Sequence, residues 1–135
     1  MLVSLAGPAS NLLAAIAFFL VLLVFRAVSA EAGGVFLNMV MTWKIPSHPS
    51  VLTPVLGIAF FGLLINLGLA LFNLLPIPPL DGHWVLYGVL PDGAGAVLEK
   101  IGSYGFVLLY ALMFLGLLRF VFVPVHWVLA LLLPV

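Results

Sequence analysis

The chain has 135 residues, of which 66% are hydrophobic and 6% are charged, whereas soluble domains are roughly 45 to 50% apolar. This composition excludes an ordinary water-soluble domain and predicts a protein of the lipid bilayer. The charges of the four basic and four acidic residues cancel, and no run of basic residues could neutralise phosphates, which argues against nucleic acid as a partner. The absence of cysteine excludes disulfides, thiolate nucleophiles and zinc bound by cysteine sulfur.

Two apolar segments within residues 8–76 are long enough to cross a membrane, which takes about 20 residues. The first, residues 8–30, is predicted to begin at Pro8, because proline lacks the N–H that a first helical turn leaves unpaired. Arg26 lies near its end, where a long side chain can reach the interface. The second, residues 53–76, contains no charged residue. Both segments are predicted to be transmembrane helices.

A third apolar segment, residues 101–118, lies between Lys100 and Arg119 and is just long enough to cross. The connecting residues 31–50 are rich in glycine and proline and are predicted to form an interfacial loop, with room for a short helix against the headgroups. Residues 91–95, PDGAG, are typical of a turn. These connectors separate the three predicted spans.

The C-terminal residues 120–135 are apolar but contain Pro124, which is predicted to interrupt them. They are therefore expected to form a half-span or an interfacial segment rather than a fourth crossing. The whole pattern predicts an all-α, multi-pass membrane helical bundle with about three principal transmembrane helices. We expect a single membrane domain over residues 1–135.

The most unusual stretch of the sequence is NLLPIPPLDGHWVL, residues 73–86. Its three prolines cannot donate backbone hydrogen bonds and push the residues before them into extended conformations, so the second span must unwind here. Helix is expected to resume after Leu80. Unwound backbone at membrane depth is tolerated only where protein buries it or where it lines a wet cavity.

Asp81 follows directly after this predicted break. An ionisable residue in a membrane segment costs about 2.5 to 3.5 kcal/mol on insertion scales, so a functional role is its default interpretation. Near a helix N-terminus its charge is also favoured by the helix dipole. The competing interpretation is that Asp81 only caps the helix, within an ordinary interfacial turn. Residue types alone leave both interpretations open.

The three histidines of the chain do not supply an evident metal site around Asp81. Catalytic zinc generally takes three protein ligands, and one carboxylate cannot hold it alone. His83 is close in sequence, but residues two apart on a helix point to nearly opposite faces. His48 and His126 are each interpreted as interfacial or packed side chains.

Two blocks of this sequence resemble the site-2 protease family of intramembrane zinc metalloproteases, especially its short prokaryotic members. SLAGPASNLL, residues 4–13, is similar to the family's G-P-x-x-N segment, and residues 73–86 are similar to its N-x-x-P-x-P-x-L-D-G segment. The second block is the more specific of the two. Their spacing and the hydropathy between them also fit, so the resemblance covers nearly the whole chain.

The resemblance implies roles for individual residues. In the family, zinc is held by two histidines of an H-E-x-x-H helix and by the aspartate of the L-D-G motif, so Asp81 corresponds to the third zinc ligand. Asn73 corresponds to an asparagine that contacts the substrate backbone or the oxyanion, with helix capping as the alternative. Gly7, Pro8 and Asn11 would be structural and let helices approach near the site.

The sequence departs from the family at its most important motif, because it contains no H-E-x-x-H. That motif supplies two ligands and the glutamate that accepts a proton from zinc-bound water, so hydrolysis needs all of it. We expect the motif upstream of residue 1 in a longer protein, of which this chain is the C-terminal part. The 135 residues alone are expected to bind zinc weakly or not at all and to be inactive.

The resemblance thus predicts the C-terminal portion of a metalloprotease, a hydrolase of the prokaryotic cell membrane that cleaves membrane-spanning proteins. Its expected partners are membrane lipid and either a transmembrane protein substrate or a homologous subunit. Two alternatives remain open. One is a non-catalytic membrane scaffold or regulator of the same fold. The other is a small transporter subunit whose broken helix coordinates an ion or solute.

Overall fold

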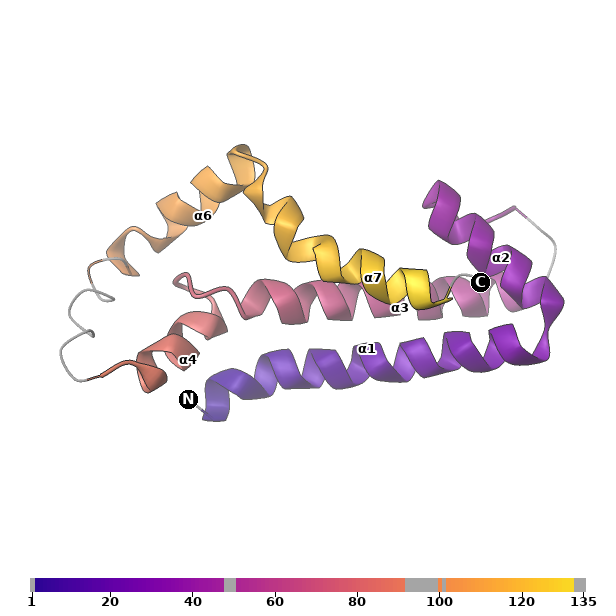
Figure 1. Ribbon diagram of the computed structural model, residues 1–135, viewed down its shortest axis with the longest axis horizontal. Coiled ribbons are helices and arrows are strands. Elements are labelled where there is room, and N and C mark those ends of the chain that lie inside the picture. Colours follow the sequence, from indigo (N-terminus) through magenta and orange to yellow (C-terminus); the bar gives the residue numbers. More distant parts are fainter. Residues whose placement is uncertain (1, 48–50, 92–99, 101, 133–135) are drawn as a thin grey trace. The chain divides into compact units, whose positions relative to one another are not determined.

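The computed structural model describes residues 2–47, 51–91, 100 and 102–132, and every regular element in these ranges is helical (Figure 1). In chain order the elements are α1 (Leu2–Val28), α2 (Ala30–Thr42), α3 (Leu52–Asn73), α4 (Asp81–Val89), α6 (Gly105–Phe114), the 3-10 helix η1 (Leu117–Phe122) and α7 (Val123–Leu132). The predicted all-α fold class is confirmed.

Two of the described helices are long and apolar enough to cross a membrane, namely Val3–Val28 within α1 and Leu52–Asn73, which is α3. A third crossing is available if Gly105–Phe114 and Leu117–Leu131 act as one span, bent by 83° at the break between them. The described part of the chain therefore holds two or three candidate spans, in agreement with the predicted number.

The first span begins earlier than predicted, because α1 starts at Leu2 and contains Pro8 in its interior. Proline in a helix removes one backbone hydrogen bond. In a bilayer, however, backbone N–H and C=O groups must form their hydrogen bonds within the helix, because no water is present to bind them. Helix therefore continues through the buried Pro8 rather than starting there.

In the predicted interfacial connector of residues 31–50, residues 31–42 belong to the helix α2, so the short helix for which the prediction left room is present. Ser29 caps this helix by accepting a hydrogen bond at 3.2 Å from the N–H of Ala32. The buried residues of α2 recur with helical spacing, which outweighs the two glycines between them; they are Ala32, Val35, Phe36 and Met39. Trp43 ends the helix in a left-handed conformation, with a φ of 56°.

The third predicted span is interrupted at a place that the sequence analysis did not identify. Gly116 adopts a φ of 68°, which side chains disfavour, and separates α6 from η1. The interruption predicted at Pro124 corresponds to the change from η1 to α7 at Val123, directly before this proline. Pro124 itself lies in the first turn of α7, a position where a missing N–H is tolerated. Of the predicted turn at residues 91–95, all but Pro91 lie outside the described residues.

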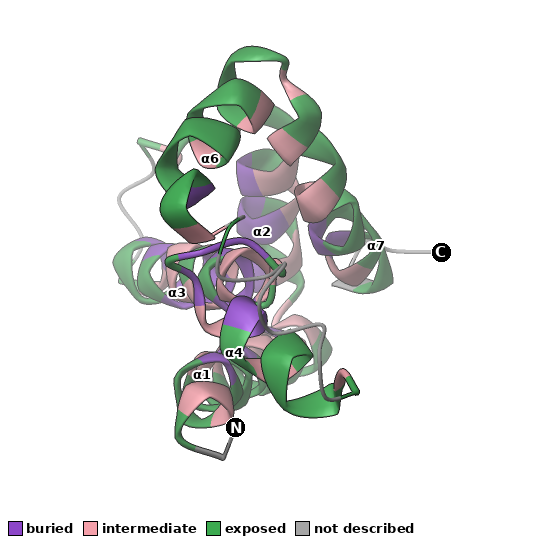
Figure 2. Cartoon of the chain, turned by 90° about the vertical axis from the view of Figure 1, so that its left-hand side faces the viewer, coloured by how far each residue is buried: buried purple, intermediate pink, exposed green. Residues whose placement is uncertain are grey.

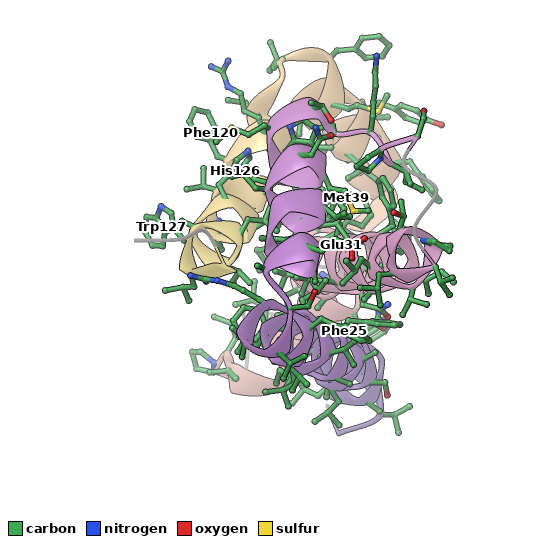
Figure 3. The ribbon with its side chains drawn as sticks, turned by 90° about the vertical axis from the view of Figure 1, so that its right-hand side faces the viewer. Phe25, Glu31, Met39, Phe120, His126 and Trp127 are labelled. Carbon is green, nitrogen blue, oxygen red and sulfur yellow. The ribbon has the colours of Figure 1, made fainter. Side chains whose placement is uncertain are left out.

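The chain divides into two compact units, and one of them comprises residues 12–67 and 124–135. Within this unit α3 supplies the buried side chains Leu56, Phe60 and Leu63. The ring of Phe60 meets that of Phe36 from α2 edge-on, with centroids 5.9 Å apart. Met39 of α2 is wholly buried, whereas Trp127 projects away from α7 (Figure 3). Aromatic and aliphatic packing thus forms the core here.

The other unit comprises residues 1–11 and 68–123 and contains the predicted motif. Its buried residues cluster around the break between α3 and α4, including Pro8, Ile77, Leu80 and His83. Much of α6, by contrast, is exposed along its length (Figure 2). Exposed apolar helix surface of this kind suits contact with lipid rather than with water.

Candidate functional site

The proline loop, residues 74–80, separates α3 from α4 within one unit of the chain. Its backbone makes short turns in place of helical bonds: the N–H of Leu75 donates to Phe72 at 3.1 Å and that of Ile77 to Leu75 at 2.8 Å. The N–H of Leu80 then donates to Ile77 at 2.9 Å. The predicted break of the second span, with helix resuming after Leu80, is therefore confirmed.

Asp81 is the first residue of α4 and is half-buried. The N-cap position belongs to Leu80, whose backbone is extended, and no side chain makes a capping hydrogen bond. The interpretation of Asp81 as a helix cap is therefore wrong. Its charge still benefits from the N-terminal end of the helix dipole. No hydrogen bond or ion pair joins its carboxylate to another described residue.

The carboxylate of Asp81 lies against the backbone of α1 at Gly7. A Cβ atom placed on Gly7 would be 3.0 Å from Oδ2 of Asp81, which is tighter than most real contacts of a Cβ. Both residues belong to the same unit. The absence of a side chain at Gly7 therefore sets how closely the carboxylate can approach α1, as the sequence analysis expected for this residue.

Two further glycines hold the proline loop between helices of the same unit. On α4, a Cβ at Gly82 would overlap the carbonyl group of Leu74. On α6, a Cβ at Gly105 would overlap the carbonyl group of Pro78. Both glycines are buried. The backbone of α4 and α6 thus lies directly against the carbonyl groups of the loop, and a residue larger than glycine at either position would prevent this contact. The packing restrains the loop that leads into Asp81.

Asn73 is the last residue of α3 and is half-buried. It and Asp81 therefore stand at the two ends of the proline loop, on different helices. The amide of Asn73 can both donate and accept hydrogen bonds, whereas the ionised carboxylate only accepts. The two side chains offer complementary polar groups on either side of the break.

His83, the described histidine in the same unit as Asp81, makes no hydrogen bond or ion pair with its carboxylate. The ring of His126, on α7, meets the ring of Trp43 with centroids 6.3 Å apart. His83 is buried against Trp84, with ring centroids 5.5 Å apart, and its Nδ1 has no hydrogen-bond partner among the described residues. His48 lies outside the described residues.

No group of three metal-ligating side chains exists within residues 2–47, 51–91, 100 and 102–132. A tetrahedral zinc site needs more donors than the single carboxylate of Asp81. The described residues by themselves therefore do not fit a zinc ion, although Asp81 has the chemistry of one ligand.

Sequence reasoning missed the packing of Gly105 and the burial of His83. Gly105 contacts a carbonyl far away in the sequence, and no local pattern around it marks that contact. The apolar neighbours of His83 on α4 give no sign of its burial, because Trp84 and Tyr87 are themselves exposed. Its unpartnered nitrogen likewise depends on what the fold places around it.

An apolar span that breaks at prolines and resumes at a partly buried carboxylate defines a helical membrane protein with a polar site at the break. A family model described as Peptidase family M50 matches residues 1–117, and the chain belongs to this family, the site-2 protease family. The resemblance seen in the two sequence blocks is thereby confirmed. No solved structure matches the chain.

Two curated relatives illustrate the match. One, named "Putative zinc metalloprotease YwhC", from Bacillus subtilis, is 36% identical over 114 residues, which cover 82% of this chain and 44% of that protein. The other, named "Putative zinc metalloprotease MJ0611", from Methanocaldococcus jannaschii, is 37% identical over 84 residues, which cover 62% of this chain and 31% of that protein. The chain thus matches less than half the length of either relative.

Proposed function

We propose that these 135 residues form the C-terminal part of the catalytic core of an intramembrane zinc metalloprotease, and that Asp81 is one of its three zinc ligands. The observation that carries the proposal is the position of Asp81: half-buried, at the first residue after a broken span, and without a polar partner among the described residues. Membership of the site-2 protease family supports it, as do the names of the two relatives.

The remaining ligands come from polypeptide outside these 135 residues. The sequence has no H-E-x-x-H, and that motif would supply two imidazoles and a general base. We call the combination of that polypeptide with these 135 residues the complete enzyme. In it, Asp81 contributes a negative charge held at the start of α4, and the proline loop and Gly7 restrict where its carboxylate can lie.

Asn73 is proposed to contact the peptide backbone of the substrate or the oxyanion that forms on it. Its place at the end of α3, next to the proline loop, supports this role. A neutral amide can donate to a developing negative charge without adding a charge of its own. The substrate proposed from the family is a membrane-spanning protein, and the bacterial and archaeal relatives favour a prokaryotic cell membrane.

A non-catalytic scaffold or regulator of the same fold is the second candidate, and it is favoured by one observation, the lack of H-E-x-x-H in this sequence. Such a protein would pair with a homologous subunit or hold a substrate helix. The transporter alternative gains a second broken helix, at Gly116, but membership of a peptidase family argues against it.

Zinc content tests the proposal and separates the two candidates. The purified 135-residue chain is expected to hold far less than one zinc per molecule, because a lone carboxylate cannot replace two imidazoles. The complete enzyme is expected to hold one zinc per molecule and to cleave a membrane-helix substrate. Elemental analysis and a cleavage assay measure both. If the natural full-length protein had no H-E-x-x-H, bound no zinc and cleaved no substrate, the scaffold function would be supported instead.

Gly7→Ala in the complete enzyme is expected to weaken zinc binding by about tenfold, the effect of disturbing the support of a metal ligand. The new Cβ displaces Oδ2 of Asp81, which is the free end of a flexible side chain. Thermal stability should therefore be preserved, or rise slightly with alanine's better helix propensity. Gly33→Ala is the matched control, because a Cβ there meets nothing within 4 Å. Equal zinc affinity in the two variants would contradict a role for Gly7 in positioning Asp81.

A further inference from the structure

An apolar groove lies within the unit of residues 12–67 and 124–135. Three helices form it, and every side chain that lines it is apolar, including Leu12, Ile16 and Phe19 of α1, Leu63 of α3, and Val128 and Leu131 of α7. Its volume is about 220 Å³. We call it the α1–α3–α7 groove. Its walls belong to the two helices that are long enough to span a membrane and to α7.

The chemistry of the groove restricts what can occupy it. A purely apolar cavity does not hold water, which needs two to four polar partners. The lining side chains offer no hydrogen-bond donor or acceptor, so the part of an occupant that enters the groove must itself be apolar. Leu12 and Ile16 are 46% and 47% exposed, which leaves the groove open on the outer side of α1. A flexible hydrocarbon chain meets this requirement.

Arg26 marks the end of the groove at which Leu131 lies. Its Nη1 donates a hydrogen bond at 3.2 Å to the carbonyl of Leu131, whose side chain lines the groove. A guanidinium has five N–H donors, and a phosphate can accept two of them in parallel. Glu31 is the next acidic residue in sequence, but no ion pair joins it to Arg26, and no other described residue neutralises this charge.

We propose that the α1–α3–α7 groove binds one acyl chain of an anionic phospholipid whose phosphate pairs with Arg26. The occupant is inferred from two independent features, a groove lined only by apolar side chains and a cation tied to one wall of that groove, for which no described residue supplies a counter-charge. Arg26 also lies in the last turn of the apolar α1, where lipid headgroups are expected. The site does not involve Asp81, and its argument does not depend on the proposed zinc chemistry.

Competition between two lipids with identical acyl chains tests the headgroup contact. The full chain is purified in detergent, incubated with equal amounts of phosphatidylglycerol and phosphatidylcholine, and the retained lipid is counted by native mass spectrometry. Phosphatidylglycerol is expected to be favoured about fivefold, the effect of one basic residue near an anionic lipid. Arg26→Gln, which keeps a donor for Leu131, should abolish this preference. Arg119→Gln, at an exposed cation over the ring of Phe120, should preserve it.

Filling the groove tests the acyl-chain contact. Ile16→Trp should remove most of the retained lipid of both kinds, whereas Leu13→Trp, at a more exposed position of α1 that does not line the groove, should not. Helical content by circular dichroism verifies folding, and Val128→Phe fills the groove from α7 if Ile16→Trp misfolds. Equal retention of the two lipids by the unmodified chain would overturn the proposal. So would unchanged retention after filling, or a dimer that filling dissociates.

Discussion

Asp81→Asn in the complete enzyme is expected to abolish cleavage of a membrane-helix substrate and to reduce bound zinc, with little loss of folding. Asparagine has nearly the size of aspartate, and the carboxylate makes no hydrogen bond or ion pair with another described residue that the change would break. What the change removes is the negative charge that balances a metal cation. Loss of one of three ligands should lower the zinc affinity by more than the roughly 10- to 100-fold loss caused by mutating a residue that only hydrogen-bonds to a ligand.

This experiment needs protein level, zinc and activity measured on the same samples, by immunoblot, elemental analysis and substrate cleavage. Glu31→Gln is the matched control, because Glu31 also lies in the first turn of a helix but is exposed and belongs to the other unit. It should leave zinc and cleavage unchanged. An Asp81→Asn variant with one zinc per molecule and normal cleavage would show that Asp81 is not a ligand, and the proposed function would lose its central residue.

Gly105→Ala is expected to destabilise the protein by about 1 to 3 kcal/mol, the usual cost of overpacking. The added methyl group would overlap the carbonyl of Pro78, which is backbone and cannot rotate away as a side chain can. Alanine would by itself stabilise a helix by roughly 0.5 to 1 kcal/mol relative to glycine, so the steric cost must exceed this gain. Gly82→Ala should behave in the same way, against the carbonyl of Leu74.

Thermal unfolding in detergent, followed by circular dichroism, measures the effect. Gly33→Ala on α2 is expected to raise the thermal stability instead, because its Cβ would enter open space and only the helix propensity changes. The stabilities of the Gly105→Ala and Gly33→Ala variants should therefore lie on opposite sides of the unmodified chain. If Gly105→Ala were as stable as Gly33→Ala, the packing of the proline loop against α6 would be contradicted.

The sequence by itself determined the features that depend on local chemistry. Hydropathy predicted the membrane class and the two long helices, because a bilayer requires continuous apolar helix whatever surrounds it. The prolines predicted that the second span unwinds around residues 76–79 and that helix resumes after Leu80, since a missing N–H and a restricted φ act within a few residues. The helix α3 ends at Asn73 rather than at the predicted Pro76. The motif also singled out Asp81 and Asn73 as candidates for the site.

Only the tertiary structure decided the features that depend on neighbours distant in sequence. Pro8 lies inside a helix and Pro124 at the start of one, so the same residue type has different consequences according to where the surrounding helix begins. The contact of Gly7 with Asp81 and that of Gly105 with Pro78 join segments whose approach no local pattern encodes. The α1–α3–α7 groove likewise exists only because three helices converge, since apolar side chains in sequence do not reveal whether they pack together or leave a space between them.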